Sequence, residues 1–200
     1  QSINPVVDIT NFVLLELGQP LHAFDQKKIS GGIQVVAAKE NEKLVLLDNN
    51  KITLLGGELV ILDDSGPLAL AGIMGGLASS ISPETKEIFL ESAYFDAVSI
   101  SGRARSFGLN TDSSHRFERG VDFDNTLYAL DRTTQLIIDI CGGQASEAID
   151  LSYELPDRKP ITLRTKKVSK IMGVDIEENE IKVVLEKLSL KFKKQNDNFI

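Results

Sequence analysis

A short polar segment in the middle of the chain, residues 108–120, holds an unusual concentration of side chains that could do chemistry. Its sequence, GLNTDSSHRFERG, places one threonine, two serines, one histidine, two arginines and two carboxylates between two glycines. Ser113 or Ser114 could form a nucleophilic triad with His115 and a carboxylate, although the sequence contains no GxSxG nucleophile elbow. The segment is therefore compatible with a catalytic loop, a metal site, an RNA-binding loop or a solvated turn.

Metal chemistry has little support in the residue types. The chain has two histidines, His22 and His115, and neither a CxxC nor an HExxH spacing. Structural zinc takes four nitrogen or sulfur ligands and catalytic zinc usually three protein ligands, so a metal site would need nearby carboxylates as well. The single cysteine, Cys141, ends an apolar helical pattern and is predicted to be a small buried side chain rather than a nucleophile. One cysteine also excludes an internal disulfide and fits a reducing compartment.

Glu91 is the most unusual single residue, because it interrupts the apolar run IFLESAYF. A carboxylate in such a run must face solvent or find a partner, since burial of an unpaired charge is costly. Alternation along a strand predicts the solvent-facing position. The alternative is an acceptor at the floor of a pocket, ready for a donor such as a phenol or an amine.

A glycine-rich stretch, ALAGIMGGLAS, follows another apolar run at residues 69–79. Gly72, Gly75 and Gly76 favour a tight turn in a β-rich fold, and alternatively a backbone that lets a ligand come close. The pattern matches neither a Walker A motif nor the GxGxxG fingerprint, so phosphate binding is unsupported.

Short strand-like segments between turn residues must position these groups, and they occupy residues 32–70 and 87–95. Helical patterns flank them. The first, 8–18, has Asp8 or Thr10 as candidate N-cap and Gly18 as its end, and the Pro-containing segment 19–25 is predicted to be a connection. Residues 96–108 predict a second helix, capped by Asp96. The clearest helix covers 124–143, and the apolar face predicted for it comprises Leu127, Leu130, Leu136, Ile137 and Ile140.

The charge distribution predicts two modules. Residues 156–200 hold 11 Lys and Arg against 7 Asp and Glu, whereas residues 1–155 hold 11 against 22. This change coincides with the linker-like segment 152–160, so we place a boundary near residue 155. The acidic part is not expected to bind nucleic acid avidly alone. No apolar run approaches the ~20 residues of a membrane-spanning helix. No signal-peptide pattern is present, and the missing initiator Met suggests a piece of a longer protein.

Five separated motifs carry a family resemblance: NPVVDITNFVLLELGQPLHAFD, LAGIMGG, IFLESAYFD, SISGRARSFGLNTDSSHRFERGVD and LIIDICGG. In this order and spacing they resemble the B3/B4 editing-domain family of the bacterial phenylalanyl-tRNA synthetase β subunit, over residues 1 to about 153. The tail that begins ITLRTKK resembles the start of the following B5 module. The resemblance implies an α+β fold, with a β-rich editing domain and flanking helices at 1–154 and a truncated winged-helix-like module at 155–200.

The resemblance also implies a role for individual residues. Glu91 matches the glutamate that receives the hydroxyl of a tyrosyl substrate, and His22 matches the editing-site histidine near the ester, the candidate catalytic residue. Gly75 matches a pocket glycine, and Thr111 matches a threonine on the pocket wall. Ser113 stands where many relatives carry Ala, so its hydroxyl narrows the pocket or adds a hydrogen bond.

The activity that the resemblance implies is hydrolysis of mischarged Tyr-tRNA(Phe), with no metal or cofactor in this fragment. ATP and Mg²⁺ would serve the complete enzyme, whose activation site lies in the other subunit. The implied partners are the acceptor end of tRNA(Phe) and the α subunit of an α2β2 heterotetramer, in the cytoplasm and away from membranes. Gln1 stands where some relatives have Arg, which weakens an RNA contact there. Two alternatives stay open: a non-catalytic scaffold with a degenerate pocket, and a free-standing hydrolase with another substrate preference.

Overall fold

The computed structural model describes residues 2–200, which form two compact units that divide between Leu151 and Ser152. Gln1 lies outside the described residues. Each unit combines helices with antiparallel strands, so the predicted α+β fold class is confirmed.

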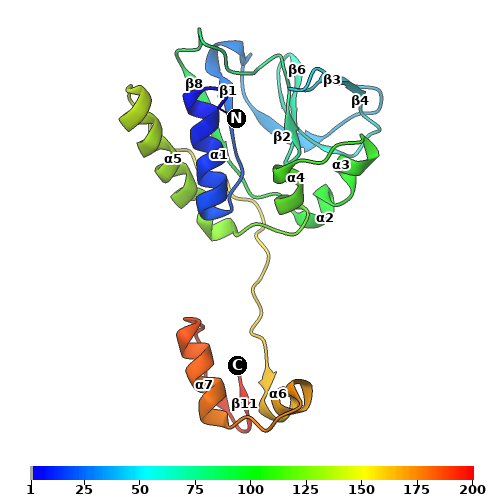
Figure 1. Cartoon of the computed structure of the whole chain (residues 1–200). Coiled ribbons are helices and arrows are strands. Elements are labelled where there is room, and N and C mark those ends of the chain that lie inside the picture. Colours follow the sequence, from blue (N-terminus) through cyan, green and yellow to red (C-terminus); the bar gives the residue numbers. More distant parts are fainter. Residues whose placement is uncertain (1) are drawn as a thin grey trace. The chain divides into compact units, whose positions relative to one another are not determined.

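Antiparallel strands occupy the centre of the larger unit (Figure 1). One sheet has the order β2-β5-β6-β7, formed by β2 (Gln34–Ala37), β5 (Leu59–Asp63), β6 (Gly66–Leu70) and β7 (Met74–Gly75). A separate hairpin joins β3 (Lys43–Val45) to β4 (Lys51–Thr53). The strands predicted across residues 32–70 are confirmed, and apolar residues from them enter one core. Fully buried members of this core include Phe24, Leu46, Leu54, Val60, Leu70, Ile100 and Phe117.

A second, two-stranded sheet pairs β1 (Leu21–Asp25) with β8 (Ile88–Ser92). The segment 19–25 was predicted to be a connection, and that prediction is wrong for most of it. Helix α1 has already ended before Pro20, and Leu21–Asp25 pair with a strand far away in the sequence. Long-range pairing of this kind overrides the local turn signal of the proline. One-turn 3₁₀ helices, η1 (Gln26–Lys28) and η2 (Phe123–Asn125), follow β1 and precede the last helix of this unit.

Helix α1 (Pro5–Leu17) lies beside the β1–β8 pair and begins one turn earlier than predicted (Figure 1). Its N-cap is Asn4, whose side chain accepts a backbone N–H of the first turn at 2.9 Å. The prediction of Asp8 or Thr10 as cap is wrong, because proline is tolerated at the first helical position and extends the helix toward the N-terminus. Gly18 ends the helix in the left-handed conformation, as predicted.

Helix α5 (Thr126–Cys141) packs against α1 through Ala129 and Thr133, both fully buried. The predicted apolar face is wrong in part, because Leu127 and Ile140 are 45% and 62% exposed. The buried face of α5 is thus centred on Ala129 and Thr133, and the larger residues near its two ends lie outside that face.

Cys141, predicted to be buried, is exposed at the end of α5. The backbone from Gly142 to Ile161 forms no regular structure, and its residues are exposed. The end of α5 therefore has no cover within the described residues, and that prediction is wrong for this structural reason.

Three short helices complete the larger unit: α2 (Ala97–Ile100), α3 (Arg103–Ser106) and α4 (Asp112–Phe117). Asp96 caps α2 as predicted, but the single helix expected over 96–108 is two separate turns. Gly102 breaks the helix with a φ of 77°, which L-residues with a Cβ rarely adopt.

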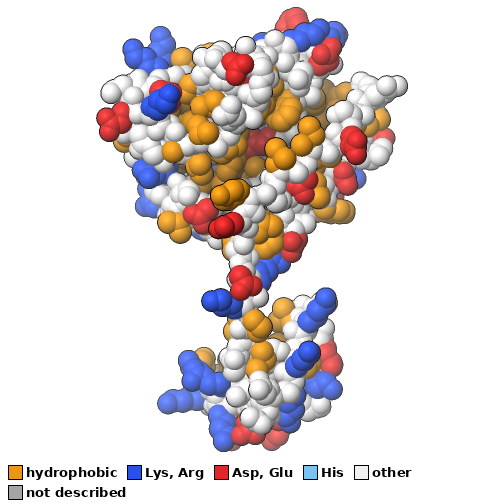
Figure 2. Space-filling view, turned by 180° about the vertical axis from the view of Figure 1, so that it is seen from behind, with side chains coloured by type: hydrophobic (Ala, Val, Ile, Leu, Met, Phe, Trp, Pro, Cys, Tyr) orange, Lys and Arg blue, Asp and Glu red, His pale blue; other side chains and the backbone are white. Residues whose placement is uncertain are grey.

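The smaller unit contains β9 (Leu163–Arg164), α6 (Thr165–Met172), α7 (Glu178–Lys187), β10 (Lys194–Gln195) and β11 (Asn198–Phe199). Its strands pair in the order β10-β11-β9, and Ile181 and Phe199 are buried. Lys and Arg side chains are prominent on the surface of this unit (Figure 2). Among residues 2–200, the helices are too short or too polar to cross a bilayer.

Candidate functional site

The β1–β8 ladder brings two ionisable side chains from distant segments together. His22 is the direct antiparallel partner of Glu91, and Leu21 pairs with Ser92. Directly paired residues point to the same face of a sheet, with Cβ atoms about 5 Å apart. The expectation that Glu91 faces open solvent is therefore wrong, because this face of the ladder forms one wall of a pocket.

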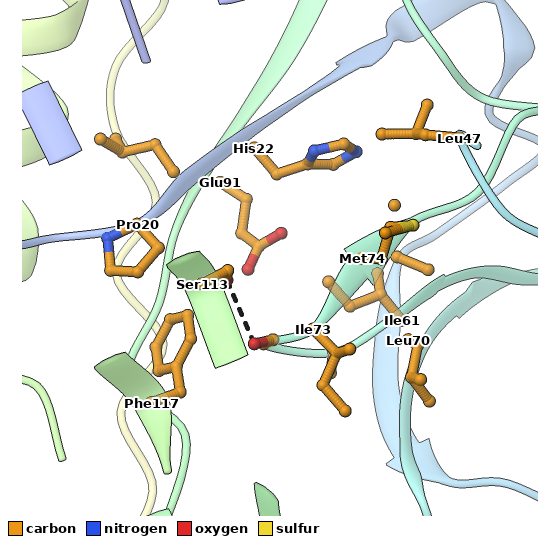
Figure 3. Close-up of a pocket in the computed structure, with 15 residues that line it drawn as sticks. Pro20, His22, Leu47, Ile61, Leu70, Ile73, Met74, Glu91, Ser113 and Phe117 are labelled. Atoms are coloured by element: carbon orange, nitrogen blue, oxygen red, sulfur yellow. Dashed lines mark hydrogen bonds between the residues drawn. The ribbon is translucent and has the colours of Figure 1, made fainter. Parts of the chain in front are cut away.

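The pocket has a volume of about 180 Å³ and a predominantly apolar lining. Figure 3 shows His22, Glu91 and Ser113 around the same space as the apolar side chains of β5 to β7. Among the described residues, no lysine or arginine lines it. The lining consists of Pro20, Leu21, His22, Leu47, Ile61, Ala69, Leu70, Ala71, Gly72, Ile73, Met74, Gly75, Glu91, Ser113 and Phe117.

The Glu91 carboxyl group points into this apolar space (Figure 3). Its side chain is only partly exposed, and within residues 2–200 it makes no hydrogen bond or ion pair. Burial disfavours the charged form and raises the pKa of Glu91 to about 7. Both protonation states are therefore populated near neutral pH, and in both states the carboxyl oxygens are free to accept a hydrogen bond from a ligand.

The His22 ring is held tightly beside Glu91. Its edge meets the ring of Phe24, with centroids 4.4 Å apart and planes at 86°. On the other side it lies against Gly75, where an added Cβ would fall 2.3 Å from His22 Cε1 and 2.6 Å from Nε2. Burial lowers the pKa of His22 to about 4, so the imidazole is neutral near pH 7. Its Nε2 has no hydrogen-bond partner among the described residues.

The wall opposite the ladder is the loop after β6, fixed by hydroxyl groups of α4. Thr111 Oγ1 donates to Ile73 O at 2.8 Å and accepts the Ser114 N–H at 3.0 Å, as the N-cap of α4. Ser113 Oγ donates to Gly72 O at 3.1 Å (Figure 3). Ser113 lines the pocket, whereas Thr111 lies outside the lining and contacts the pocket wall through its hydrogen bond to Ile73 O.

The structure brings His22, Glu91, Gly75 and Ser113 to one pocket and leaves His115 elsewhere. His115 lines a separate, open depression of about 480 Å³, together with Gly18, Arg116, Arg119 and three residues that follow. Neither Ser113 nor Ser114 bonds to His115, because their hydroxyls donate to backbone carbonyls. No three His, Cys, Asp or Glu side chains in residues 2–200 are placed to hold a metal ion.

Sequence reasoning missed several lining residues, above all Pro20, Leu47 and Phe117. Leu47 reaches the pocket because its N–H donates to Gly75 O at 3.1 Å, which docks the β3–β4 hairpin on β7. Phe117 and Leu47 are ordinary apolar residues in the sequence, so no local signal distinguishes them from the rest of the core. Pro20 carried a signal, because it directly precedes the strand that bears His22.

Comparison with known proteins gives a consistent set of similarities. The family model described as the B3/4 domain matches residues 1–142. The phenylalanine–tRNA ligase beta subunit of Pseudomonas syringae pv. tomato is 50% identical over 199 residues, covering 98% of this chain and 25% of that protein. The corresponding subunit of Dechloromonas aromatica is 48% identical, with 100% and 25% covered. The chain thus spans about a quarter of the length of these curated relatives.

A solved structure shares the fold at low sequence identity. An N-terminal fragment of the phenylalanyl-tRNA synthetase beta subunit from Pyrococcus horikoshii aligns with a TM-score of 0.51 and 16% identity. The alignment covers 97% of this chain and 58% of that one. At this identity the likeness concerns the fold alone.

Proposed function

The chain belongs to the B3/4 domain family, and on that premise we propose that its pocket hydrolyses mischarged Tyr-tRNA(Phe) as the editing site of a phenylalanine–tRNA ligase β subunit. The observation that carries the proposal is the unpartnered Glu91 carboxyl group, which faces an apolar pocket directly opposite His22 on the paired strand. An apolar cavity with one acceptor at its wall suits an aromatic ring that carries a hydroxyl group.

The physics of specificity explains why such a site is useful. An apolar synthetic pocket built for phenylalanine rejects a substrate with one added hydroxyl by only ~10². A second pocket with a buried acceptor applies the opposite test, because phenylalanine leaves that acceptor unpaired after water is displaced. In this role Glu91 selects the tyrosyl side chain, while the apolar residues around it contact the ring.

The proposed reaction is direct hydrolysis of the ester. A water molecule attacks the ester carbonyl carbon, the bond to the ribose oxygen breaks, and a proton from the water passes to that oxygen, which leaves free tyrosine and tRNA. His22 is neutral at physiological pH and accepts a hydrogen bond from the water, which orients it. The hydroxyl group of Ser113 donates to Gly72 O rather than to a base that could activate it as a nucleophile, so the proposed reaction has no covalent enzyme intermediate.

The remaining properties belong to the complete ligase and are proposals for this chain. The hydrolytic step uses no ATP or Mg²⁺, which serve amino-acid activation in the α subunit of an α2β2 enzyme. The acceptor end of tRNA(Phe) delivers the ester to the pocket, and the enzyme acts in the cytoplasm. Gly75 keeps the His22 ring in place, and Ser113 narrows the cavity at the wall formed by Gly72.

The test is deacylation of Tyr-tRNA(Phe) by the complete ligase, with wild type, Glu91→Ala and Glu87→Ala. Glu87 lies just before β8 with a mostly exposed side chain, so its variant controls for loss of a carboxylate. We expect wild type and Glu87→Ala to clear the tyrosyl ester and Glu91→Ala to lose its preference for tyrosine over phenylalanine. If wild type does not deacylate Tyr-tRNA(Phe), the domain is a non-catalytic scaffold. If Glu91→Ala retains the preference, Glu91 is not the selector.

A further inference from the structure

Gln19 is a buried polar residue at the end of the ladder that carries His22 and Glu91. It is 1% exposed and lies between the end of α1 and the start of β1. Its Nε2 donates two hydrogen bonds, to Pro20 O at 3.1 Å and to Ala93 O at 2.8 Å. These two carbonyl groups lie just outside the last pair of the β1–β8 ladder, Leu21 and Ser92.

Proline makes this end of the ladder unusual. Continuing the register by one pair sets Pro20 opposite Ala93, but proline has no N–H to donate. The Gln19 amide supplies donors in its place and ties one carbonyl from each strand to the same nitrogen. A side chain therefore closes the ladder where the backbone cannot.

Within residues 2–200, the amide oxygen of Gln19, unlike the amide nitrogen, is left without a partner. Gln19 Oε1 is buried and has no hydrogen-bond partner among the described residues. A buried acceptor without a partner is unfavourable, so the amide is oriented by its two donor contacts at the expense of its oxygen. An apolar side chain of similar size would avoid this cost but would leave both carbonyls unsatisfied.

The hydrogen bonds of Gln19 lie directly beside the pocket. Pro20 and Leu21 line the pocket, and the ionisable pair follows one step further along the ladder. Displacement of reacting or binding groups by about 1 Å can cost 10²-fold in rate. If the strands could separate at this end of the two-stranded ladder, Glu91 and His22 would move relative to each other and to the opposite wall of the pocket.

We propose that Gln19 is a positioning residue that fixes the spacing of Glu91 and His22 across the pocket and thereby sets the preference for a tyrosyl over a phenylalanyl ester. The proposal rests on the proposed editing function. It assigns Gln19 no contact with the substrate, because Gln19 lies behind Pro20 and outside the pocket lining.

The experiment compares wild type, Gln19→Met and Gln135→Met in the complete ligase. Gln135 is an exposed glutamine of α5 whose side-chain amide donates to Asp139 Oδ1, so its variant is a matched control. Deacylation of Tyr-tRNA(Phe) and Phe-tRNA(Phe) is measured for each, with kcat and KM separated, together with the thermal midpoint. We expect Gln19→Met to lower the Tyr-to-Phe ratio of kcat/KM by roughly 10- to 100-fold, and Gln135→Met to leave it unchanged.

The outcomes separate the two proposals. If wild type does not hydrolyse Tyr-tRNA(Phe), the editing function itself fails. If wild type edits and Gln19→Met lowers both esters equally or only lowers the thermal midpoint, Gln19 is merely structural and the inference is overturned. Should Gln19→Met not fold, Gln19→Glu is measured against wild type across pH. The protonated carboxyl group of the introduced glutamate keeps one donor. The Tyr-to-Phe ratio of Gln19→Glu should therefore approach that of wild type at the same pH in acid, and fall below it as the glutamate ionises. A ratio that matches wild type at every pH overturns the inference.

Discussion

The preference of the pocket for tyrosine should rise with pH, because the selecting group titrates near neutrality. The pKa of Glu91 is raised from 4.5 to about 7 by burial, so ionisation of this carboxyl group falls in the accessible pH range. A carboxylate accepts a hydrogen bond from a phenol more strongly than a neutral carboxyl group does. A phenylalanyl substrate forms no hydrogen bond with the carboxylate and is disfavoured, because it removes water from that charge.

The size of the effect follows from the titration curve. With a pKa of about 7, the ionised fraction of Glu91 is roughly one tenth at pH 6 and roughly nine tenths at pH 8. If only the carboxylate binds the phenol productively, the Tyr-to-Phe ratio of kcat/KM rises close to tenfold across this interval. His22 stays neutral over the same range because its pKa is about 4. Among the pocket-lining residues, Glu91 is therefore the one that changes charge.

The assay measures deacylation of both esters by the complete ligase at several pH values from 6 to 8. Titration of the substrate amino group scales both esters alike and cancels in the ratio, whereas spontaneous ester hydrolysis is measured without enzyme and subtracted from each rate. Glu91→Gln is the control, because an amide cannot ionise and its ratio should be flat. A wild-type ratio that stays constant or falls as pH rises would refute the reasoning.

Three further results are expected. Gly75→Ala should reduce Tyr-tRNA(Phe) deacylation at least tenfold and lower the free energy of unfolding by about 1–3 kcal/mol, because the new Cβ overlaps the His22 ring; kinetics and urea unfolding test this. Thr111→Val should cost about 1–3 kcal/mol in urea unfolding, because it removes the α4 cap and the bond to Ile73 O. Because the pKa of Glu91 is raised in the folded state, the free energy of unfolding of wild type falls as pH rises from 4.5 through 7. The free energy of unfolding of Glu91→Gln should therefore exceed that of wild type by up to about 3 kcal/mol at pH 8, and this difference should disappear below pH 4.5.

Local patterns predicted much of the secondary structure correctly. The strands between residues 32 and 70 follow from short strand-like segments between turn residues, and β8 follows from the run around Glu91. The end of α1 at Gly18 and the cap of α2 at Asp96 follow from single residues whose backbone or side chain suits those positions. These features depend on interactions within a few residues, which one sequence displays directly.

The pocket itself depended on long-range pairing, which the sequence does not display. From its own surroundings Glu91 was expected to face solvent, and only its pairing with His22 places it at the pocket wall. The strand around His22 was missed because Pro20 suggested a connection, while the pairing partner lies far along the chain. Cys141 was expected to be buried because its apolar neighbours predict burial, yet nothing in the described chain covers the end of α5.

The order in which ribosomes deliver the chain has a consequence for this pocket. Gln19 bonds to a carbonyl 74 residues later, and the Asn125 side chain closes on Leu17 O from a distance of 108 residues. At about 5–20 residues per second, the strand with His22 waits roughly 4 to 15 seconds for β8 and the Ala93 carbonyl to be synthesised, and Asn125 follows later. During that interval β1 is an unpaired strand, and the backbone N–H and C=O groups along its edges have no strand partner. Chaperone contact with the nascent chain, and synonymous codon changes between β1 and α5, are thus expected to affect the yield of competent pockets more than their final structure.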